Sequence, residues 1–286
     1  MCADRLQLCD LGKLKQKKQP IVMVTAYDYP TGRLADEAGV DCVLVGDSLS
    51  NVVLGYPDTV PVTMDEMLHH VKAVTRAVRR AVVIADMPFL SFQVSPERAI
   101  ENAGRFLKEG LAQAVKVEGG GHLVPTVASM VRAGIPTVGH LGLTPQTASL
   151  LGGYHVQGKT GRAAHAILED AWHLEQAGIS LLVLECVPDR LAARIAKELT
   201  IPVIGIGAGA GCDGQVLVFH DLLGITFGFA PKFLKVFADA GETMRKGLSD
   251  YARQVRERTF PAVENSFSIS DEEWQRLEGS TRKERE

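Results

Sequence analysis

The sequence lacks several features that define whole classes of protein. No apolar stretch in its 286 residues reaches the ~20 residues that a membrane-spanning helix needs. Residues 1–18 are polar and basic, without the apolar core of a signal peptide. The five cysteines are odd in number and form no Cys-x-x-Cys pair, so neither a disulfide framework nor a zinc site is expected. These absences favour a cytoplasmic protein that does not bind a membrane.

A strong excess of charge is also missing. The chain has 31 Lys and Arg against 34 Asp and Glu, a net charge of −3, so nucleic acid is not expected as a partner. Hydrophobic residues make up 46% and charged residues 23%, which allows a sizeable core and argues against disorder. The length suits one large domain or two small ones, and an α/β barrel commonly has about 250 residues as a single domain.

Short runs rich in Val, Ile and Leu recur along the chain. Most do not alternate apolar with polar residues, which is typical of strands in a parallel sheet covered by helices. The last run is the weakest, because it could instead extend a helix suggested by Gln215–His220. The expected strands are Ile21–Ala26, Cys42–Val45, Ala81–Ala85, Ala114–Val117, Ile135–Val138, Ser180–Leu184, Pro202–Ile206 and Leu222–Phe227.

Segments with helical composition separate many of these runs. Thr63 and Glu66 form a capping-box pattern before one of them, and Ser95 is an expected N-cap of another. Strand and helix alternate about eight times, which predicts a (β/α)8 barrel, with an open doubly wound sheet as the alternative. The expected helices are Met64–Arg80, Pro96–Glu109, Gly161–Ala177 and Pro188–Leu199.

The composition changes near Asn265. Ser266–Glu286 is polar and strongly charged, with one short helix expected at Asp271–Leu277. We therefore expect a single barrel domain over residues 1–265, with a short N-terminal extension. The tail over residues 266–286 is expected to lie on the surface or to span subunits.

Carboxylates end four of the expected strands, namely Asp47, Asp86, Glu118 and Glu185. In a barrel, the C-terminal strand ends converge on one face, where the catalytic groups of this fold lie. Carboxylates crowded there would raise one another's pKa unless a cation compensates, and oxygen ligands favour Mg²⁺. The alternative is that each acid separately caps a helix or lies in a solvated loop.

Lys116 lies two residues before Glu118, so both are expected on the lumen side of one strand while Val115 and Val117 face the helices. A lysine pointing inward is costly unless it is paired, which indicates an anionic substrate; the alternative is a surface lysine on a misassigned strand. His140 also follows an apolar run. It either contacts substrate or metal, or is a hydrogen-bonded structural histidine.

Two glycine-rich segments imitate nucleotide-binding motifs. Gly153–Thr160 matches the Walker A pattern, but the residues before it do not resemble the buried strand that this motif requires. Gly205–Gly211 follows a strand but lacks the surrounding dinucleotide-binding unit. We expect the first to be a loop near the mouth of the site. The second is expected to allow close packing, although its backbone amides could bind an anion.

Several long motifs together resemble the ketopantoate hydroxymethyltransferase family, also called 3-methyl-2-oxobutanoate hydroxymethyltransferase. The resemblance runs in the same order from about Leu11 to Phe267, and the Gly153–Thr160 loop looks like one in that family. Ser50-Asn51 departs from it, because Gly followed by a larger apolar residue such as Met is expected there. The motifs are Val45–Leu49, Ala85–Phe89, Val115–Gly120, Gly139–Gln146 and Cys212–Val218.

The resemblance implies a (β/α)8 TIM barrel of the phosphoenolpyruvate-mutase/isocitrate-lyase type. It implies transfer of a hydroxymethyl group from the cosubstrate 5,10-methylenetetrahydrofolate to 3-methyl-2-oxobutanoate, through a Mg-stabilised enolate. The product would be 2-dehydropantoate, in the first step of pantothenate and coenzyme A biosynthesis. Such enzymes are usually ring-shaped homo-oligomers, often decamers.

The resemblance also implies residue roles. Asp47 and Asp86 are expected to hold Mg²⁺, with Glu118 as a ligand directly or through water. Ser48 is expected to donate a hydrogen bond to the oxo acid, and Lys116 to neutralise its carboxylate. The expected substrate-binding residues are Asp47, Ser48, Asp86, Lys116 and His140.

Glu185, at the end of a different strand, is the expected general base that removes the proton from C3 of the oxo acid. Three competing functions remain open. A lyase or phosphomutase could use the same barrel, although the Lys-Lys-Cys-Gly loop common in such lyases is absent from the sequence. The others are a nucleotide-binding protein acting through Gly153–Thr160, and a non-catalytic barrel that binds anions.

Overall fold

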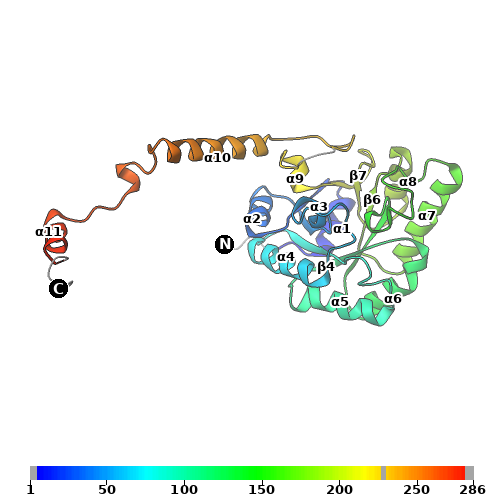
Figure 1. Cartoon of the computed structure of the whole chain (residues 1–286). Helices are drawn as coiled ribbons and strands as arrows, with labels where there is room; N and C mark the ends of the chain where they lie inside the picture. The colour runs from blue at the N-terminus through cyan, green and yellow to red at the C-terminus, as the bar shows by residue number, and fades with distance from the viewer. Residues whose placement is uncertain (1–4, 227–229, 281–286) are drawn as a thin grey trace. The chain divides into compact units, whose positions relative to one another are not determined.

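A computed structural model describes residues 5–226 and 230–280, and within these ranges eight parallel strands close into a barrel (Figure 1). Each strand pairs with the next, and β8 pairs with β1. The predicted (β/α)8 barrel is confirmed, and the open doubly wound sheet is wrong. The strands are β1 (Ile21–Thr25), β2 (Cys42–Val45), β3 (Val82–Asp86), β4 (Ala114–Glu118), β5 (Thr137–Gly142), β6 (Leu181–Glu185), β7 (Val203–Ile206) and β8 (Gly214–Leu217).

The alternation of side chains along β4 separates the two faces of the barrel wall. Val115 and Val117 pack in the apolar layer between strands and helices, whereas Ala114 belongs to the apolar cluster inside the barrel. The register places Lys116 beside Asp86 of β3, and Glu118 beside His140 of β5. Strand pairing alone therefore brings acidic and basic residues from three strands to the same level of the lumen.

Helices cover the outside of the barrel (Figure 1), and the four predicted helices are confirmed with slightly different ends. The helix after Thr63 ends at Ala77 instead of Arg80. The Asp36 carboxylate accepts hydrogen bonds from the backbone N–H groups of residues 79, 80 and 81, which holds that segment in a non-helical path. The outer helices are α2 (Tyr29–Glu37), α4 (Met64–Ala77), α5 (Pro96–Lys108), α6 (Val124–Arg132), α7 (Gly161–Gln176) and α8 (Asp189–Glu198).

Short helical turns lie in the loops that follow the strands. They are α3 (Leu49–Val52), η1 (Gly121–Leu123), η2 (Pro145–Thr147) and α9 (Phe219–Leu222). Of these, α3 and η2 follow β2 and β5 directly, so they carry side chains into the C-terminal end of the barrel.

The N-terminal end of the barrel is closed by α1 (Leu8–Gln16). Leu11 is fully buried in the same apolar cluster as Ile21 and Cys42 of the lumen. Lys15 donates a hydrogen bond to the carbonyl of Ile201 and pairs with Asp213, which fixes the helix against two strand-connecting loops. The sequence predicted only a polar extension here, although this segment seals one end of the core.

The eighth strand lies earlier in the chain than predicted. Leu222–Phe227 is not a strand: α9 ends at Leu222, and Phe227 lies outside the described residues. The strand is instead Gly214–Leu217, where the helix suggested over Gln215–His220 is also wrong in its first half. Its outward side chain, Gln215, is exposed, so β8 lacks the continuous apolar run by which buried strands are recognised.

The fifth strand is longer than predicted. The apolar run Ile135–Val138 led to an expected end before His140, whereas β5 runs from Thr137 to Gly142. His140 is therefore a strand residue that pairs with Val183 of β6, and its side chain has the fixed direction of a barrel position.

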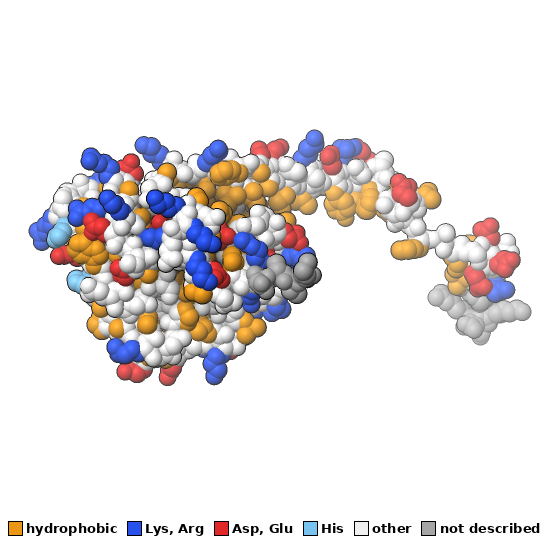
Figure 2. Space-filling view, turned by 180° about the vertical axis from the view of Figure 1, so that it is seen from behind, with side chains coloured by type: hydrophobic (Ala, Val, Ile, Leu, Met, Phe, Trp, Pro, Cys, Tyr) orange, Lys and Arg blue, Asp and Glu red, His pale blue; other side chains and the backbone are white. Residues whose placement is uncertain are grey.

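The chain divides into two compact units, Met1–Phe237 and Ala238–Glu286. The second unit contains α10 (Ala240–Arg256), η3 (Val263–Asn265) and α11 (Asp271–Ser280), which includes the helix expected at Asp271–Leu277. The helix α10 buries none of its side chains. Figure 2 shows hydrophobic side chains along it, and they follow helical spacing at Met244, Leu248, Tyr251 and Val255.

None of the described helices combines the length and the apolar character that crossing a membrane would require.

Candidate active site

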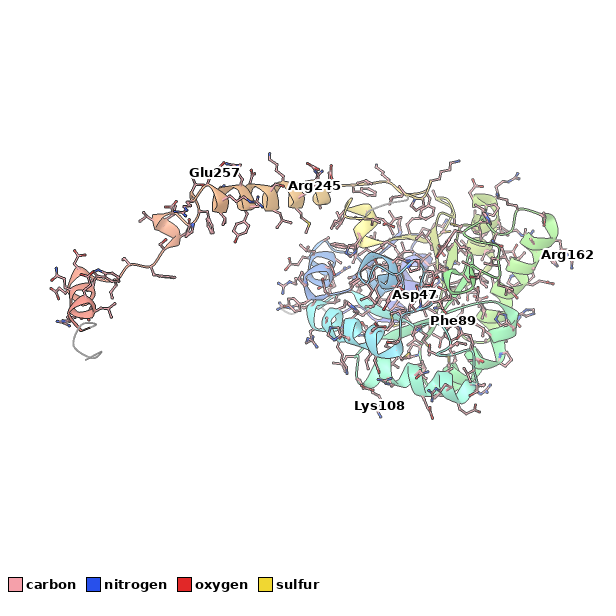
Figure 3. The ribbon with its side chains drawn as sticks, in the orientation of Figure 1. Asp47, Phe89, Lys108, Arg162, Arg245 and Glu257 are labelled. Carbon is pink, nitrogen blue, oxygen red and sulfur yellow. The ribbon has the colours of Figure 1, made fainter. Side chains whose placement is uncertain are left out.

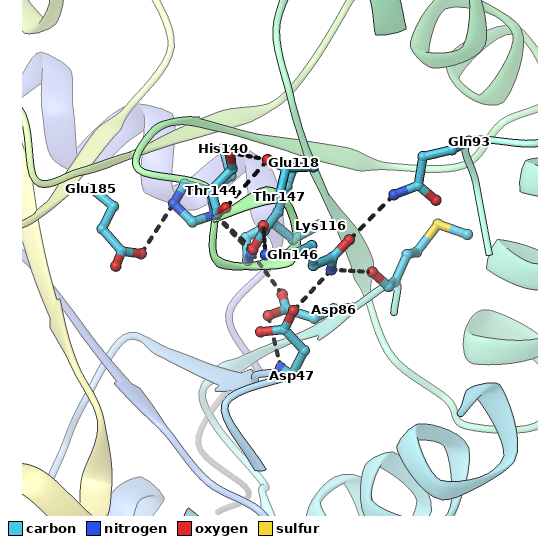
Figure 4. Close-up of polar contacts among 11 residues, drawn as sticks. Asp47, Asp86, Gln93, Lys116, Glu118, His140, Thr144, Gln146, Thr147 and Glu185 are labelled. Carbon is cyan, nitrogen blue, oxygen red and sulfur yellow. Dashed lines mark hydrogen bonds and ion pairs between the residues drawn. The ribbon is translucent and has the colours of Figure 1, made fainter. Parts of the chain in front are cut away.

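A buried cluster of charged side chains occupies the C-terminal end of the barrel. In Figure 3, Asp47 lies inside the ring of helices, whereas Lys108 and Arg162 lie at its periphery. Figure 4 shows the cluster and its contacts. The buried members are Asp47, Asp86, Lys116, Glu118 and His140, each no more than 4% exposed.

Asp47 and Asp86 are linked by a hydrogen bond from the backbone of the first to the carboxylate of the second. The backbone N–H of Asp47 donates to Oδ2 of Asp86 at 3.0 Å. Burial raises the pKa of both carboxyl groups, and the negative charges of Glu118 and Asp86 raise that of Asp47 further. Oδ1 of Asp86 is buried and accepts no aligned hydrogen bond from the described residues. The same oxygen lies 3.2 Å from the Lys116 ammonium, so a cation bound there would share it with the lysine or displace it.

Lys116 supplies the fixed positive charge of the cluster. Its ammonium lies 3.2 Å from Oδ1 of Asp86, 3.4 Å from Oε1 of Glu118 and 3.1 Å from Nδ1 of His140. Burial alone would lower the pKa of Lys116, but Asp86, Glu118 and Asp47 together outweigh it and raise the pKa. The expectation of an inward-pointing lysine is confirmed, and the alternative of a surface lysine is wrong.

Both oxygens of Glu118 are already engaged. Oε1 lies 3.2 Å from Nδ1 of His140, and Oε2 accepts the backbone N–H of Gln146 at 3.1 Å. Burial would raise the pKa of Glu118, but Lys116 and His140 overcome it and lower the pKa to about 2. Glu118 therefore stays ionised and supports its neighbours.

His140 lies between two glutamates. Its Nδ1 faces Glu118, and its Nε2 lies 3.3 Å from Oε2 of Glu185, whose side chain is 16% exposed. Burial and Lys116 lower the pKa of His140, but the two glutamates outweigh them and raise it to about 9. All four predicted strand-end acids thus belong to one hydrogen-bonded or ion-paired cluster, so the alternative that they serve separately is wrong.

Ser48 lies on the turn that follows Asp47. Its hydroxyl lies 2.8 Å from the hydroxyl of Tyr27, which is fully buried after β1. A Cβ on Gly46 would lie 2.8 Å from Oγ of Ser48 and 3.5 Å from Oδ2 of Asp86. A glycine at position 46 therefore leaves space for both groups to face the lumen.

The backbone around Glu185 is tightly fixed. Its carbonyl accepts the N–H of Leu143 at 2.8 Å. Gly142 has φ +95°, and a Cβ there would lie 2.2 Å from the same carbonyl oxygen, so only glycine fits. The end of β5 thus sets the position of the glutamate on β6.

Comparison with known proteins decides the family. A family profile described as ketopantoate hydroxymethyltransferase matches residues 5–263. The chain belongs to this family. Of the proteins named 3-methyl-2-oxobutanoate hydroxymethyltransferase, that of Moorella thermoacetica is 56% identical over 92% of this chain and 98% of its own length. That of Carboxydothermus hydrogenoformans is 53% identical over 96% and 99%. The chain is therefore an enzyme of the hydroxymethyltransferase class.

Solved structures agree on the fold. Phosphonopyruvate hydrolase, crystallised with oxalate and Mg²⁺, matches with a TM-score of 0.59 and 12% identity over 97% of this chain and 96% of its own. A 2,3-dimethylmalate lyase of the PEP mutase/isocitrate lyase superfamily matches with a TM-score of 0.57 and 14% identity over 96% and 98%. At these identities the likeness concerns the barrel, whose predicted type is confirmed.

The two glycine-rich segments, Gly153–Thr160 and Gly205–Gly211, contribute loops and tight turns in this hydroxymethyltransferase. Gly153–Thr160 follows η2 and a series of turns instead of a strand, so the structural requirement of a Walker A motif is not met. Gly207 and Gly209 have positive φ, and a Cβ on Gly207 would lie 2.6 Å from the ring of Phe233. Close packing, as predicted, explains the second segment.

Ser50 and Asn51, which depart from the family pattern, shape the loop beside the acid cluster. Ser50 is fully buried, and its hydroxyl donates to the carbonyl of Asp58 at 2.6 Å. Asn51 donates from Nδ2 to the carbonyl of Tyr56 at 3.0 Å. The two polar side chains close this loop by hydrogen bonds.

Sequence reasoning assigned no role to Gln146 or Tyr27. Gln146 is the last residue of the family-like motif Gly139–Gln146, and it donates from Nε2 to Oδ2 of Asp47 at 2.8 Å. The motif Gly139–Gln146 was the only sequence signal that could have pointed to Gln146. A motif does not show which carboxylate the Gln146 amide will contact.

The residues present fit a Mg²⁺ site built on two carboxylates. Within residues 5–226 and 230–280, no three His, Cys, Asp or Glu side chains are gathered as a ready-made metal site. Figure 4 shows Asp47 and Asp86 side by side, with Oδ1 of Asp86 facing only the Lys116 ammonium at 3.2 Å and making no aligned hydrogen bond with a described residue. Mg²⁺ keeps several waters and binds proteins through one or two carboxylates plus substrate. Because both Glu118 oxygens are engaged, a contact through water suits Glu118 best.

Proposed function

We propose that the chain transfers a hydroxymethyl group from 5,10-methylenetetrahydrofolate to 3-methyl-2-oxobutanoate and forms 2-dehydropantoate. This would be the first step of pantothenate and coenzyme A biosynthesis, carried out in the cytoplasm. The name shared by relatives more than 50% identical over almost the whole chain supports the reaction. The observation that carries the chemistry is the single buried cluster that joins two adjacent carboxylates, one lysine and the half-buried Glu185.

The oxo acid is a small anion, and the cluster offers groups suited to each of its ends. Lys116, which lies 3.2 Å from Asp86, would neutralise the carboxylate, and the Ser48 hydroxyl would donate a hydrogen bond to the oxo acid. Asp47 and Asp86 would hold Mg²⁺, with Glu118 acting through water. When bound, the cation would supply Lewis-acid polarisation of the 2-oxo group, which makes the C3 proton more acidic.

Glu185 then acts as the general base. The C3–H bond breaks, its proton passes to the Glu185 carboxylate, and the electron pair forms the enolate of the oxo acid. The C3 carbon of this enolate forms a new bond to the one-carbon unit, whose two bonds to the folate nitrogens break; these nitrogens take up the C3 proton and one proton from water. Water supplies the hydroxyl oxygen of the product, so oxo acid, methylenetetrahydrofolate and water give 2-dehydropantoate and tetrahydrofolate.

His140 supports this step by contact with Glu185 and Glu118, and we propose that it also lies against the bound substrate. Its Nε2 faces Oε2 of Glu185 at 3.3 Å without an aligned hydrogen bond, so it could turn to donate to a substrate oxygen that lies beside Glu185.

One assay tests the proposal against its competitors. Purified protein is incubated with the oxo acid and methylenetetrahydrofolate, with and without Mg²⁺, and 2-dehydropantoate is detected by mass spectrometry. Metal-dependent product formation is expected. If the C3 proton exchanges with solvent but no product forms, the protein enolises the oxo acid without transferring the one-carbon unit, as a lyase-like enzyme would. Binding of the oxo acid without exchange would indicate a non-catalytic barrel, and tight binding of ATP would favour the nucleotide-binding alternative.

We also propose that the protein forms a homo-oligomer, with the decamer common in the family as the form to test. The apolar stripe on α10 supports an assembly, because Leu248 is 70% exposed and Met244 and Tyr251 are each 57% exposed. In an enzyme that acts on small molecules, a second copy of the chain is the partner that best explains such an exposed apolar surface.

A further inference from the structure

Gln146 makes hydrogen bonds to two members of the buried cluster at once. It lies on η2 after β5, is 4% exposed, and contacts groups from the ends of β2, β3 and β4. Its Nε2 donates to Oδ2 of Asp47 at 2.8 Å and to the carbonyl of Met87 at 2.9 Å. Its backbone N–H donates to Oε2 of Glu118 at 3.1 Å. One residue thus holds two of the carboxylates proposed to surround the cation.

The orientation of the Gln146 amide follows from its partners. A backbone carbonyl only accepts hydrogen bonds, so the nitrogen must face Met87, and Oδ2 of Asp47 accepts from the same nitrogen. The oxygen then faces Gln93, whose Nε2 donates to it at 3.3 Å. All donors and the acceptor of the amide have partners, which fixes its rotation (Figure 4).

A neutral amide suits this position better than a charged group. A lysine would compete with the cation for Asp47, and a glutamate would add repulsion and could not donate while ionised. The amide donates to Oδ2 of Asp47 and does not engage Oδ1. Asp47 is thereby prepared to bind a cation through one oxygen, in the manner that a small octahedral ion requires.

We propose that Gln146 is a positioning residue that tunes the cation site: it fixes the Asp47 carboxylate for single-oxygen ligation and reserves Glu118 for contact through water. This inference rests on the proposed Mg²⁺ site. It predicts that Gln146 determines both the affinity for Mg²⁺ and the preference for Mg²⁺ over Ca²⁺, because Ca²⁺ tolerates variable geometry and shared carboxylate oxygens.

The test compares Gln146→Met with the matched control Gln113→Met. Gln113 also makes two hydrogen bonds, to the N–H of Val83 and the carbonyl of Leu6, but it lies at the opposite end of β4 from Glu118. Mg²⁺ and Ca²⁺ binding are measured by isothermal titration calorimetry on the full chain. Loss of an outer hydrogen bond to a metal ligand typically weakens binding about 10- to 100-fold.

The expected result is a loss of this size for Mg²⁺ in Gln146→Met, a smaller loss for Ca²⁺, and near wild-type binding in Gln113→Met. Equal Mg²⁺ affinity in Gln146→Met and wild type would overturn the inference, as would an equal loss for both ions. If wild type itself binds no Mg²⁺, the proposed cation site fails and this inference with it. Should Gln146→Met not fold, Gln146→Asn decides, since its shorter amide cannot reach both Asp47 and Met87. Unchanged Mg²⁺ affinity in that variant would overturn the inference.

Discussion

The Lys116 ammonium lies 3.2 Å from Oδ1 of Asp86, and both side chains are at most 4% exposed. They stand beside each other because β3 and β4 pair in a register that aligns these two positions. Their attraction is strong because water is excluded, and the same exclusion makes either charge costly when it is left alone.

Lys116→Met should therefore destabilise the metal-free protein. Removing one partner of a buried pair typically costs about 3–5 kcal/mol in the free energy of unfolding. Urea denaturation measures this loss, and added Mg²⁺ should recover part of it by supplying positive charge to the orphaned acids. The control is Lys72→Met, which breaks an exposed pair with Glu109 and should cost about 0–1 kcal/mol. Equal losses in the two variants would show that the lysine is not paired as described.

Glu185→Gln should separate binding from chemistry. The amide keeps the size of the side chain but cannot accept the C3 proton, so oxo-acid and metal affinity should change little. Exchange of C3 hydrogen in D₂O, followed by proton NMR, should slow by at least about 100-fold, the lower range for loss of a general base. Wild-type exchange rates in this variant would remove Glu185 from the role.

Protons and Mg²⁺ should compete at the two adjacent aspartates. Burial raises the pKa of Asp47 and of Asp86, so the metal-free fold favours their protonated forms above the usual range near pH 4. Their contribution to stability is present below the unfolded pKa and is lost as pH rises through the folded pKa. The melting temperature of the metal-free protein should fall across that interval, and Mg²⁺ should reverse the fall.

The same competition predicts proton release on metal binding. Calorimetry in buffers of different ionisation enthalpy should show protons released when Mg²⁺ binds below the raised pKa values, and affinity should increase with pH. Mg²⁺ affinity that does not vary between pH 5 and pH 8 would contradict the pKa directions.

The apolar stripe on α10 should control assembly. Leu248→Glu places a charge in the middle of the stripe formed by Met244, Leu248, Tyr251 and Val255. Light scattering coupled to size exclusion should show a smaller particle than wild type, with circular dichroism unchanged. Arg256→Glu on the same helix is the control for charge alone. A wild-type particle size in Leu248→Glu would show that another surface holds the copies together.

The sequence predicted the features that depend on local pattern. Alternation in Val115-Lys116-Val117-Glu118 was enough to place Lys116 in the lumen, because side-chain direction in a strand has a period of two. The absence of a strand before Gly153 predicted a loop there instead of a Walker A motif, and the structure shows turns at that place. The eighth strand was misplaced because Gln215 is exposed and breaks the apolar run used to recognise strands.

Features that depend on distant contacts could not be predicted. Gln146 reaches Asp47 across 99 positions of sequence, and only the closed barrel brings the two together. Leu11 likewise sits in a polar segment, and its burial in the lumen becomes visible only once the strands enclose a space for it. Tertiary packing, not local propensity, determines the burial and the contacts of such residues.

The central claim is that Asp47 and Asp86 hold one cation and that this cation binds the oxo acid. Titration of 3-methyl-2-oxobutanoate into wild type and Asp86→Ala, each with Mg²⁺ and with EDTA, tests it most directly. The account predicts tight binding only in wild type with Mg²⁺, because cation and substrate share the site and must strengthen each other. Equal affinity in EDTA, or an unchanged metal requirement in Asp86→Ala, would contradict it.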